Sequence, residues 1–163
     1  MAQEIEAKFR VSSHDPVRAR LQACGAKPLG CVLERNRIYD RQDGSLRAAG
    51  CGLRLRTISQ EDGTSGQGTL TFKGPVGPGP FKSREEIETG ITDPAALEAI
   101  LDRLGLLPIL VYDKRRESWA WNGCRIELDE VPRLGRFVEI EGPDEKTIAA
   151  VRDRLGLGRA DHE

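Results

Sequence analysis

The sequence predicts an α+β fold in which eight antiparallel strands form a closed barrel with helices packed outside. Two observations and one general property of barrels lead to this prediction. The triplet Glu-Ile-Glu occurs at residues 4–6, 86–88 and 139–141, and in a strand each copy turns two carboxylates to one face and isoleucine to the other. Eight short strand-like segments are separated by turn residues, and three helical segments lie among them. A barrel of about eight strands has no free edges and leaves room for one small ligand.

The first strand is expected at the N-terminus, because charged residues alternate there with Ile5, Ala7, Phe9 and Val11. A helix is the alternative, since Glu, Ala and Lys are good helix formers. Asn122-Gly123 is the strongest hairpin signal, and a second turn is expected at Gly63 to Gly68. Further strands are predicted near residues 32–39, 52–59, 68–73, 82–88, 111–121, 124–130 and 136–141.

Three helices are predicted from the signals at their ends. Each begins with an aspartate and a proline and stops just before a glycine, as helix termini prefer. The three segments begin at Asp15-Pro16, Asp93-Pro94 and Pro143-Asp144 and end before Gly25, Gly105 and Gly156. The Gly/Pro-rich segment 74–80 excludes regular structure, and is either a cover for a binding site or a plain connection.

Charged side chains occupy one parity of the strands. They are Glu4, Glu6, Glu86, Glu88, Glu127, Asp129, Glu139 and Glu141, with Lys8, Arg54, Arg56, Lys73, Arg84, Lys114, Arg116 and Arg125. Solvated outer strand faces and internal ion pairs are two ordinary explanations. Repeated pairs of like charges disfavour the first, and the cost of desolvating ion pairs disfavours the second. We therefore expect a hydrated cavity that binds a polyanion and its metal.

The apolar residues of the opposite parity are expected to face outward against the helices. They are Ile5, Leu53, Leu55, Phe72, Ile87, Ile126, Leu128, Val138 and Ile140.

Length and composition limit the classes of protein to which this chain can belong. The 163 residues are expected to form one domain, residues 1–163, and a net charge of −1 gives no basic field for nucleic acid. No apolar run approaches the roughly 18 residues of a membrane span, and the N-terminus has no signal-peptide pattern. The four cysteines lack CxxC spacing and are expected to be reduced and mostly buried, in a cytoplasmic protein.

The charged segments resemble the CYTH superfamily, the triphosphate tunnel metalloenzymes. Glu4-x-Glu6-x-Lys8 is similar to the ExExK signature of that superfamily. The similarity continues through Leu53-Arg54-Leu55-Arg56, Leu70 to Pro75, Ser83 to Glu88, Asp113 to Arg116, Glu127 to Val131 and Leu134 to Glu141. The resemblance covers nearly the whole chain and implies an eight-stranded tunnel with a charged interior.

The resemblance also implies roles for the charged residues. Mg²⁺ or Mn²⁺ would be held by Glu4, Glu6, Asp129, Glu139 and Glu141, because hard cations prefer carboxylate oxygen. The triphosphate would be bound by Lys8, Arg54, Arg56, Lys73, Arg84, Lys114, Arg116 and Arg125, since guanidinium groups match phosphate oxygens. Lys73, Glu139 and Arg116 are the expected catalytic residues. Glu86, Glu88 and Glu127 would either face the metal or orient arginines.

The reaction implied is that of a class IV adenylyl cyclase, which forms cyclic AMP and pyrophosphate from ATP. The close alternative is hydrolysis of tripolyphosphate or thiamine triphosphate, because both reactions use the same cations and carboxylates. A module that binds polyphosphate or nucleotide without turnover is a third hypothesis, which the metal-type carboxylates disfavour. The expected partner is one small triphosphate, with no membrane and no nucleic acid, in a monomer or homodimer.

Overall fold

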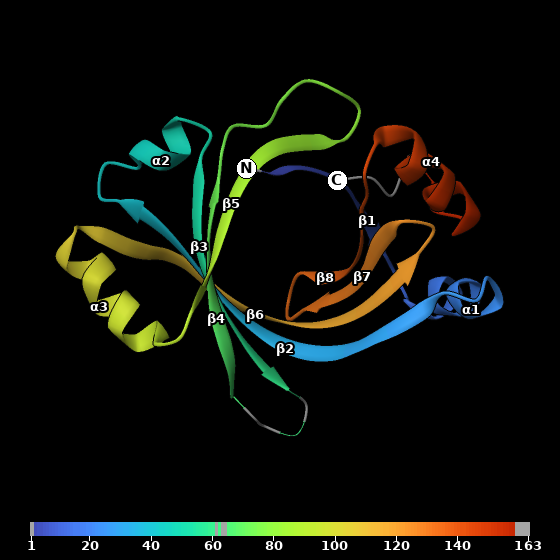
Figure 1. Ribbon diagram of the computed structural model, residues 1–163, viewed down its shortest axis with the longest axis horizontal. Coiled ribbons are helices and arrows are strands. Elements are labelled where there is room, and N and C mark those ends of the chain that lie inside the picture. Colours follow the sequence, from blue (N-terminus) through green and yellow to red (C-terminus); the bar gives the residue numbers. More distant parts are fainter. Residues whose placement is uncertain (1, 61, 63–64, 159–163) are drawn as a thin grey trace. The chain divides into compact units, whose positions relative to one another are not determined.

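The computed structural model describes residues 2–60, 62 and 65–158 (Figure 1). Its strands are β1 Ala2–Val11, β2 Lys27–Arg41, β3 Gly52–Gln60, β4 Ser65–Lys73, β5 Lys82–Ile91, β6 Leu106–Trp121, β7 Cys124–Val131 and β8 Gly135–Glu141. Its helices are α1 Asp15–Ala23, α2 Ser45–Ala48, α3 Pro94–Arg103 and α4 Glu145–Arg154. The prediction of three helices is therefore one short, and β2 and β6 begin about five residues earlier than expected.

The strands close into a barrel in the order β1-β5-β4-β3-β2-β6-β7-β8, which confirms the predicted fold class. Adjacent strands pair antiparallel, as in β3 with β4 and β7 with β8. At the β6–β7 turn, Asn122 and Gly123 have φ values of 50° and 73°, which suit a two-residue hairpin of the primed type. The turn predicted at Gly63 to Gly68 lies partly outside the described residues, although β3 and β4 form the hairpin it requires.

The described chain divides into two compact units. The α4 unit comprises Glu4–Cys31, Pro78–Ser83 and the residues from Lys114 onward. In it, α1 and α4 cover the same face of β1, β7 and β8 (Figure 1). Its core contains the fully buried residues Phe9, Leu21, Ile126, Val138, Ile140, Ile148 and Val151. The opposite face of these strands is the inner face of the barrel, and it carries the charged side chains.

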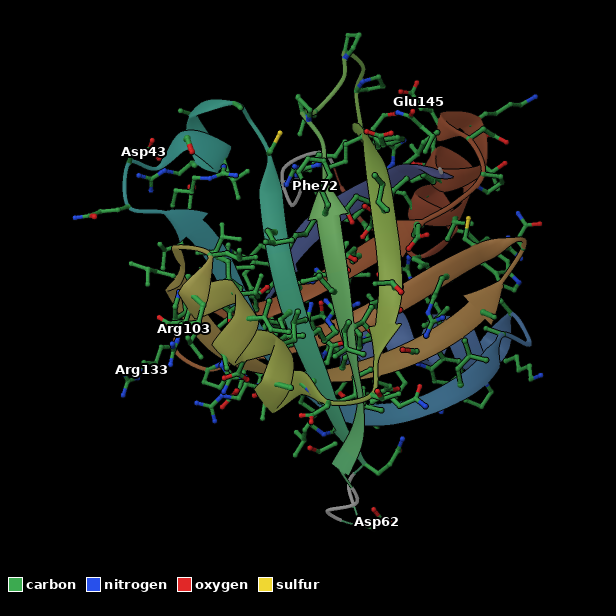
Figure 2. The ribbon with its side chains drawn as sticks, turned by 60° about the vertical axis from the view of Figure 1, so that its left-hand side comes forward. Asp43, Asp62, Phe72, Arg103, Arg133 and Glu145 are labelled. Carbon is green, nitrogen blue, oxygen red and sulfur yellow. The ribbon has the colours of Figure 1, made fainter. Side chains whose placement is uncertain are left out.

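The α3 unit comprises Val32–Gly77 and Arg84–Asp113, together with the first three residues. Strands β3, β4 and β5 lie side by side in Figure 2, with Phe72 on β4. Helix α3 packs through Leu101 against Tyr39 and Leu55 of β2 and β3. Ile87 was expected beneath a helix, and that expectation is wrong because 46% of Ile87 is exposed. The apolar cluster under α3 includes Ile91 of β5, which lies four residues after Ile87.

Side-chain caps explain why two of the helices begin where the sequence predicts. Asp93 accepts a hydrogen bond from Ala96 N at 3.0 Å, and Asp144 accepts one from Thr147 N at 2.7 Å. The unpredicted α2 depends instead on Asp40 at the end of β2. The buried carboxylate of Asp40 accepts from the backbone N–H groups of Leu46 and Arg47, at 2.9 and 3.0 Å.

All four cysteines are free thiols, as expected of a chain without CxxC pairs. Only Cys124 is buried, so the expectation that most of them are buried is wrong. Within the described residues, no helix has the length and apolar content needed to span a bilayer.

Candidate functional site

Asp129 on β7 is the centre of the charged inner face in the α4 unit. Arg116 donates from Nε to Oδ1 at 2.7 Å and from Nη2 to Oδ2 at 2.6 Å, and Lys114 Nζ donates to Oδ2 at 2.9 Å. Asp129 is almost fully buried, and burial alone would raise its pKa. The hydrogen bonds and positive charges of Arg116 and Lys114 outweigh burial and lower the pKa of Asp129 to about 2. Asp129 is therefore ionised and holds both bases in place.

Acids stand directly opposite acids on the neighbouring strands. Glu6 of β1 pairs with Glu141 of β8, and Glu127 of β7 pairs with Glu139 of β8. Reduced hydration raises the pKa of Glu141, and the negative charges of Glu4 and Glu139 raise it further. Like charges placed opposite one another destabilise a sheet. This arrangement therefore favours a bound cation.

Different bases lie next to Glu139 and Glu127. Glu139 lies 3.5 Å from Arg116 Nη2. Burial would raise the pKa of Glu139, but the charges of Arg116 and Lys114 lower it overall. Glu127 is engaged differently, because its carboxylate accepts hydrogen bonds from Ser118 Oγ and from Arg125 Nε. Glu127 and Arg125 thus form a local pair.

Phe137 of β8 lies on the same inner face and contacts two bases of β1. The ammonium of Lys8 lies 4.8 Å from the centre of the Phe137 ring, and the guanidinium of Arg10 lies 4.7 Å from it. Cation–π attraction at these distances restrains both side chains. The ring therefore supports Lys8, one of the predicted triphosphate ligands.

The inner face of the α3 unit carries a second charged group, centred on Arg56 of β3. Arg56 Nε donates to Asn36 Oδ1 at 2.9 Å and lies 3.2 Å from Glu34 Oε2. Both β2 residues are buried, Asn36 completely. Asn36 stands directly opposite Arg56 in the β2–β3 register, so the pairing of the strands sets this contact.

Glu86 of β5 lies between two of the predicted triphosphate ligands. Its Oε1 lies 3.5 Å from Lys73 Nζ and 4.0 Å from Arg54 Nη2. Glu88 accepts a hydrogen bond from Thr71 Oγ1 at 2.9 Å. In this structure, Glu86 therefore orients bases, which was one of the two roles left open for it.

Arg84 of β5 contacts backbone carbonyls. Its Nε donates to Gly74 O at 2.7 Å and its Nη2 donates to Gly50 O at 3.3 Å. It thereby ties the start of the Gly/Pro-rich segment to β5. These bonds use two of its donor groups, so the triphosphate-binding role predicted for Arg84 would rest on the remaining ones.

The donor set of the α4 unit fits a hard divalent cation. Carboxylate oxygens are the ligands that Mg²⁺ and Mn²⁺ prefer, and the opposed acids Glu6 and Glu141 would be relieved by a positive charge. Across the described chain, no three side chains of metal-ligating type already converge on one point. Binding would therefore require side-chain rotation. Asp129 is the most strongly engaged candidate, since it already accepts three hydrogen bonds from bases.

The structure thus places the predicted residues in two groups. The α4 unit holds Glu4, Glu6, Lys8, Lys114, Arg116, Arg125, Glu127, Asp129, Glu139 and Glu141, and the α3 unit holds Arg54, Arg56, Lys73, Arg84, Glu86 and Glu88. Sequence reasoning missed Glu34, Asn36, Ser118 and Phe137. Phe137 was detectable, because it shares the parity of Glu139 and Glu141.

Comparisons with known proteins agree with this architecture. The CYTH domain model matches residues 2–162. A Methanocaldococcus jannaschii protein named "Putative adenylate cyclase" is 28% identical over 151 residues, which cover 93% of this chain and 81% of that protein.

Two solved structures illustrate the range of the fold. The PH1012 protein of Pyrococcus horikoshii OT3 superposes with a TM-score of 0.84 at 28% identity, covering 98% of this chain and 94% of that one. A Hippeastrum protein described as having a dominant triphosphatase activity superposes with a TM-score of 0.69 at 19% identity, covering 94% of this chain and 88% of that one. With the family model matched along almost its full length, this chain belongs to the CYTH domain family.

Proposed function

We propose that this protein is a divalent-cation-dependent enzyme that converts ATP to cyclic AMP and pyrophosphate. The observation that carries the proposal is the opposition of Glu6 to Glu141 and of Glu127 to Glu139 on an inner face that also holds Lys114 and Arg116. Acids in this arrangement suit a cation, and the neighbouring bases suit the oxygens of a polyanion. Membership of the CYTH family and the name of the archaeal relative support the choice of reaction.

Mg²⁺ or Mn²⁺ is the proposed cofactor, with Glu4, Glu6, Glu139 and Glu141 as its ligands and Asp129 as a further one. When bound, such an ion would neutralise charge on the phosphoryl oxygens.

The bases would then bind and orient the triphosphate. Arg116 is held at two atoms by Asp129, so its guanidinium plane is fixed before substrate arrives. Lys73 is oriented by Glu86 and Arg56 by Asn36. Such preorganised positive groups stabilise the charge that develops on phosphoryl oxygens during transfer. We propose Lys73, Arg116 and Glu139 as catalytic residues, with Lys8, Arg54, Arg56, Arg84, Lys114 and Arg125 as additional triphosphate ligands.

Hydrolysis of tripolyphosphate or thiamine triphosphate is the second candidate. It is favoured by two aromatic residues of the α4 unit, Phe137 and Trp119, which offer little to a purine. The Phe137 ring already contacts Lys8 and Arg10, and Trp119 is buried in the core beneath the helices. A cavity of about 630 Å³ is lined by Phe9, Phe81 and Ala149, among others, and lies on the helix-covered side of β1. The Hippeastrum relative shows that proteins of this fold include one described as a triphosphatase.

One assay separates the candidates. Purified protein would be incubated with ATP, thiamine triphosphate or tripolyphosphate in Mg²⁺ or Mn²⁺, and the products resolved by chromatography. Cyclic AMP with pyrophosphate supports the cyclase. Orthophosphate released from any of the three supports the hydrolase, and binding without products supports a binding module.

A further inference from the structure

The side-chain amide of Asn36 on β2 contains a donor that the α3 unit leaves unsatisfied. Asn36 is 0% exposed, and its Oδ1 accepts from Arg56 Nε at 2.9 Å. A guanidinium group only donates, so the oxygen of the amide must face Arg56. The orientation of the amide is thereby fixed. Its Nδ2 is buried and has no hydrogen-bond partner within the described chain.

A second buried donor lies at the adjoining position of the same face. Arg54 Nε is also buried without a hydrogen-bond partner among the described residues. In the β2–β3 register, Asn36 stands opposite Arg56, and Arg54 is the next residue of β3 on that face. Buried polar groups in native proteins are nearly always paired. Two unsatisfied donors at neighbouring positions indicate that an acceptor from outside the chain binds here.

The surrounding charge identifies the chemistry of that acceptor. Arg54, Arg56 and Lys73 present three positive charges on this face, beside the carboxylates of Glu34 at 3.2 Å from Arg56 and Glu86 at 3.5 Å from Lys73. The open positions of Asn36 and Arg54 are both donors. An anion with several acceptor oxygens satisfies both requirements, whereas a neutral carbonyl or a water molecule satisfies only the hydrogen bonding. A phosphoryl group has three such oxygens and binds to amide and guanidinium donors.

We propose that Asn36 binds the substrate directly, with Nδ2 and the neighbouring Arg54 Nε donating to one phosphoryl group of the triphosphate. This inference rests on the proposed function and adds to it a neutral binding residue. Asn36 thus has two tasks, because Oδ1 orients Arg56 while Nδ2 contacts substrate. The alternative is that Asn36 only positions Arg56.

The sequence provides a clean experiment, because asparagine occurs only at positions 36 and 122. Protein labelled with ¹⁵N in the asparagine side chains would give two amide signals. Asn122 lies in the exposed β6–β7 turn and serves as the internal control. Titration with inorganic tripolyphosphate and Mg²⁺ should move the Asn36 signal and leave the Asn122 signal in place. An unmoved Asn36 signal at saturation, or equal movement of both signals, overturns the proposal.

Two substitutions then test the contact through the affinity for tripolyphosphate. Asn36→Asp keeps an oxygen for Arg56 but replaces the Nδ2 donor with an acceptor, and the matched control Asn122→Asp makes the same change in the exposed turn. Hydrogen bonds to charged groups correspond to roughly ten- to a hundredfold in binding. Asn36→Asp should therefore raise the Kd for tripolyphosphate by at least about tenfold, measured by calorimetry. Asn36→Asp also adds a negative charge that weakens polyanion binding by itself, so a rise in Kd supports the direct contact only together with movement of the Asn36 signal. A Kd like that of the unmodified protein would refute the direct contact.

Calorimetry on the unmodified protein distinguishes failure of the proposed function from failure of the Asn36 contact alone. If it binds no tripolyphosphate at all, the proposed function fails together with this inference. If it binds tripolyphosphate while the Asn36 signal stays unmoved, only the inference about Asn36 fails.

Discussion

Arg116 and Asp129 stand opposite each other on β6 and β7, joined by two hydrogen bonds of 2.7 and 2.6 Å. The pair is buried, and Lys114 shares the same carboxylate. Arg116 also lies 3.5 Å from Glu139 and 3.9 Å from Glu127, so acids and bases are closely mixed at this point of the inner face. Asp129 holds both bases by short hydrogen bonds, and it is therefore expected to stabilise the empty protein.

Asp129→Asn should destabilise the protein by about 3–5 kcal/mol, because it removes the buried charge that both Arg116 and Lys114 contact and leaves Arg116 with the longer contacts to Glu139 and Glu127. Equilibrium unfolding in urea measures the change. Glu130→Gln is a matched control at the next position, since 49% of the Glu130 side chain is exposed and it lies 3.3 Å from the exposed Arg136. Asp129→Asn with the stability of the control would contradict the importance given to this pair.

Glu139→Gln should abolish turnover and leave triphosphate binding largely intact, because it removes a proposed cation ligand and keeps the side-chain volume. The product assay and calorimetry with tripolyphosphate measure the two effects separately, again beside Glu130→Gln. Normal turnover of both ATP and tripolyphosphate by Glu139→Gln would show that the metal assignment is wrong.

Arg56→Ala or Lys73→Ala should weaken tripolyphosphate binding by about 1.5–3 kcal/mol, as expected for charge-assisted contacts. Arg35→Ala is the matched control. Arg35 neighbours Asn36 on β2 but has 56% of its side chain exposed, and it lies 3.9 Å from Asp113. Equal losses of affinity in Arg35→Ala and Arg56→Ala would mean that binding follows total charge and not the inner face.

His14 should make stability depend on pH in the mildly acidic range. Its buried ring donates from Nε2 to Phe137 O at 3.0 Å. Burial lowers its pKa below 6.5, and the positive charges of Arg18 and Arg136 lower it further, although the bond to Phe137 and the charge of Glu117 partly oppose this. Between the folded and unfolded pKa values the unfolded chain binds more protons, so stability should fall as the pH drops below about 6.5.

His14→Gln should remove this contribution. Urea unfolding of both proteins at pH 7.5 and pH 5.5 tests it, with His162 common to the two. If the loss of stability on acidification is the same in both proteins, the buried ring of His14 is not its source.

The barrel was predictable because the middle of several strands alternates between apolar and charged residues. In β7 and β8, Ile126, Leu128, Val138 and Ile140 are at most 2% exposed and alternate with charged residues, so period two assigns both faces. Helices α3 and α4 were predictable from the capping residues Asp93 and Asp144. Helix α2 was not, because four residues show no periodicity and their stability comes from the distant carboxylate of Asp40.

The residues of the candidate site were predictable only in strands where one of the two faces is clearly apolar. Residues Leu33 to Arg37 place polar side chains at both parities, so the sequence does not tell which of them turn inward. Asn36 and Glu34 therefore escaped notice. The ion pairs of the site were also not predictable from the sequence. Lys73 pairs with Glu86 and Arg116 with Asp129 because of the register of the strands, and strand periodicity alone does not define that register.

A thermal unfolding comparison tests whether the charged inner face binds a triphosphate together with a divalent cation. A ligand that binds only the native state stabilises it by about 2.7 kcal/mol at a hundredfold excess over Kd. Tripolyphosphate with Mg²⁺ or Mn²⁺ should therefore raise the Tm by several degrees. Orthophosphate at the same ionic strength should change it little, because it spans too few of the bases. Equal shifts from the two anions would contradict binding at the inner face and reduce the effect to nonspecific salt binding.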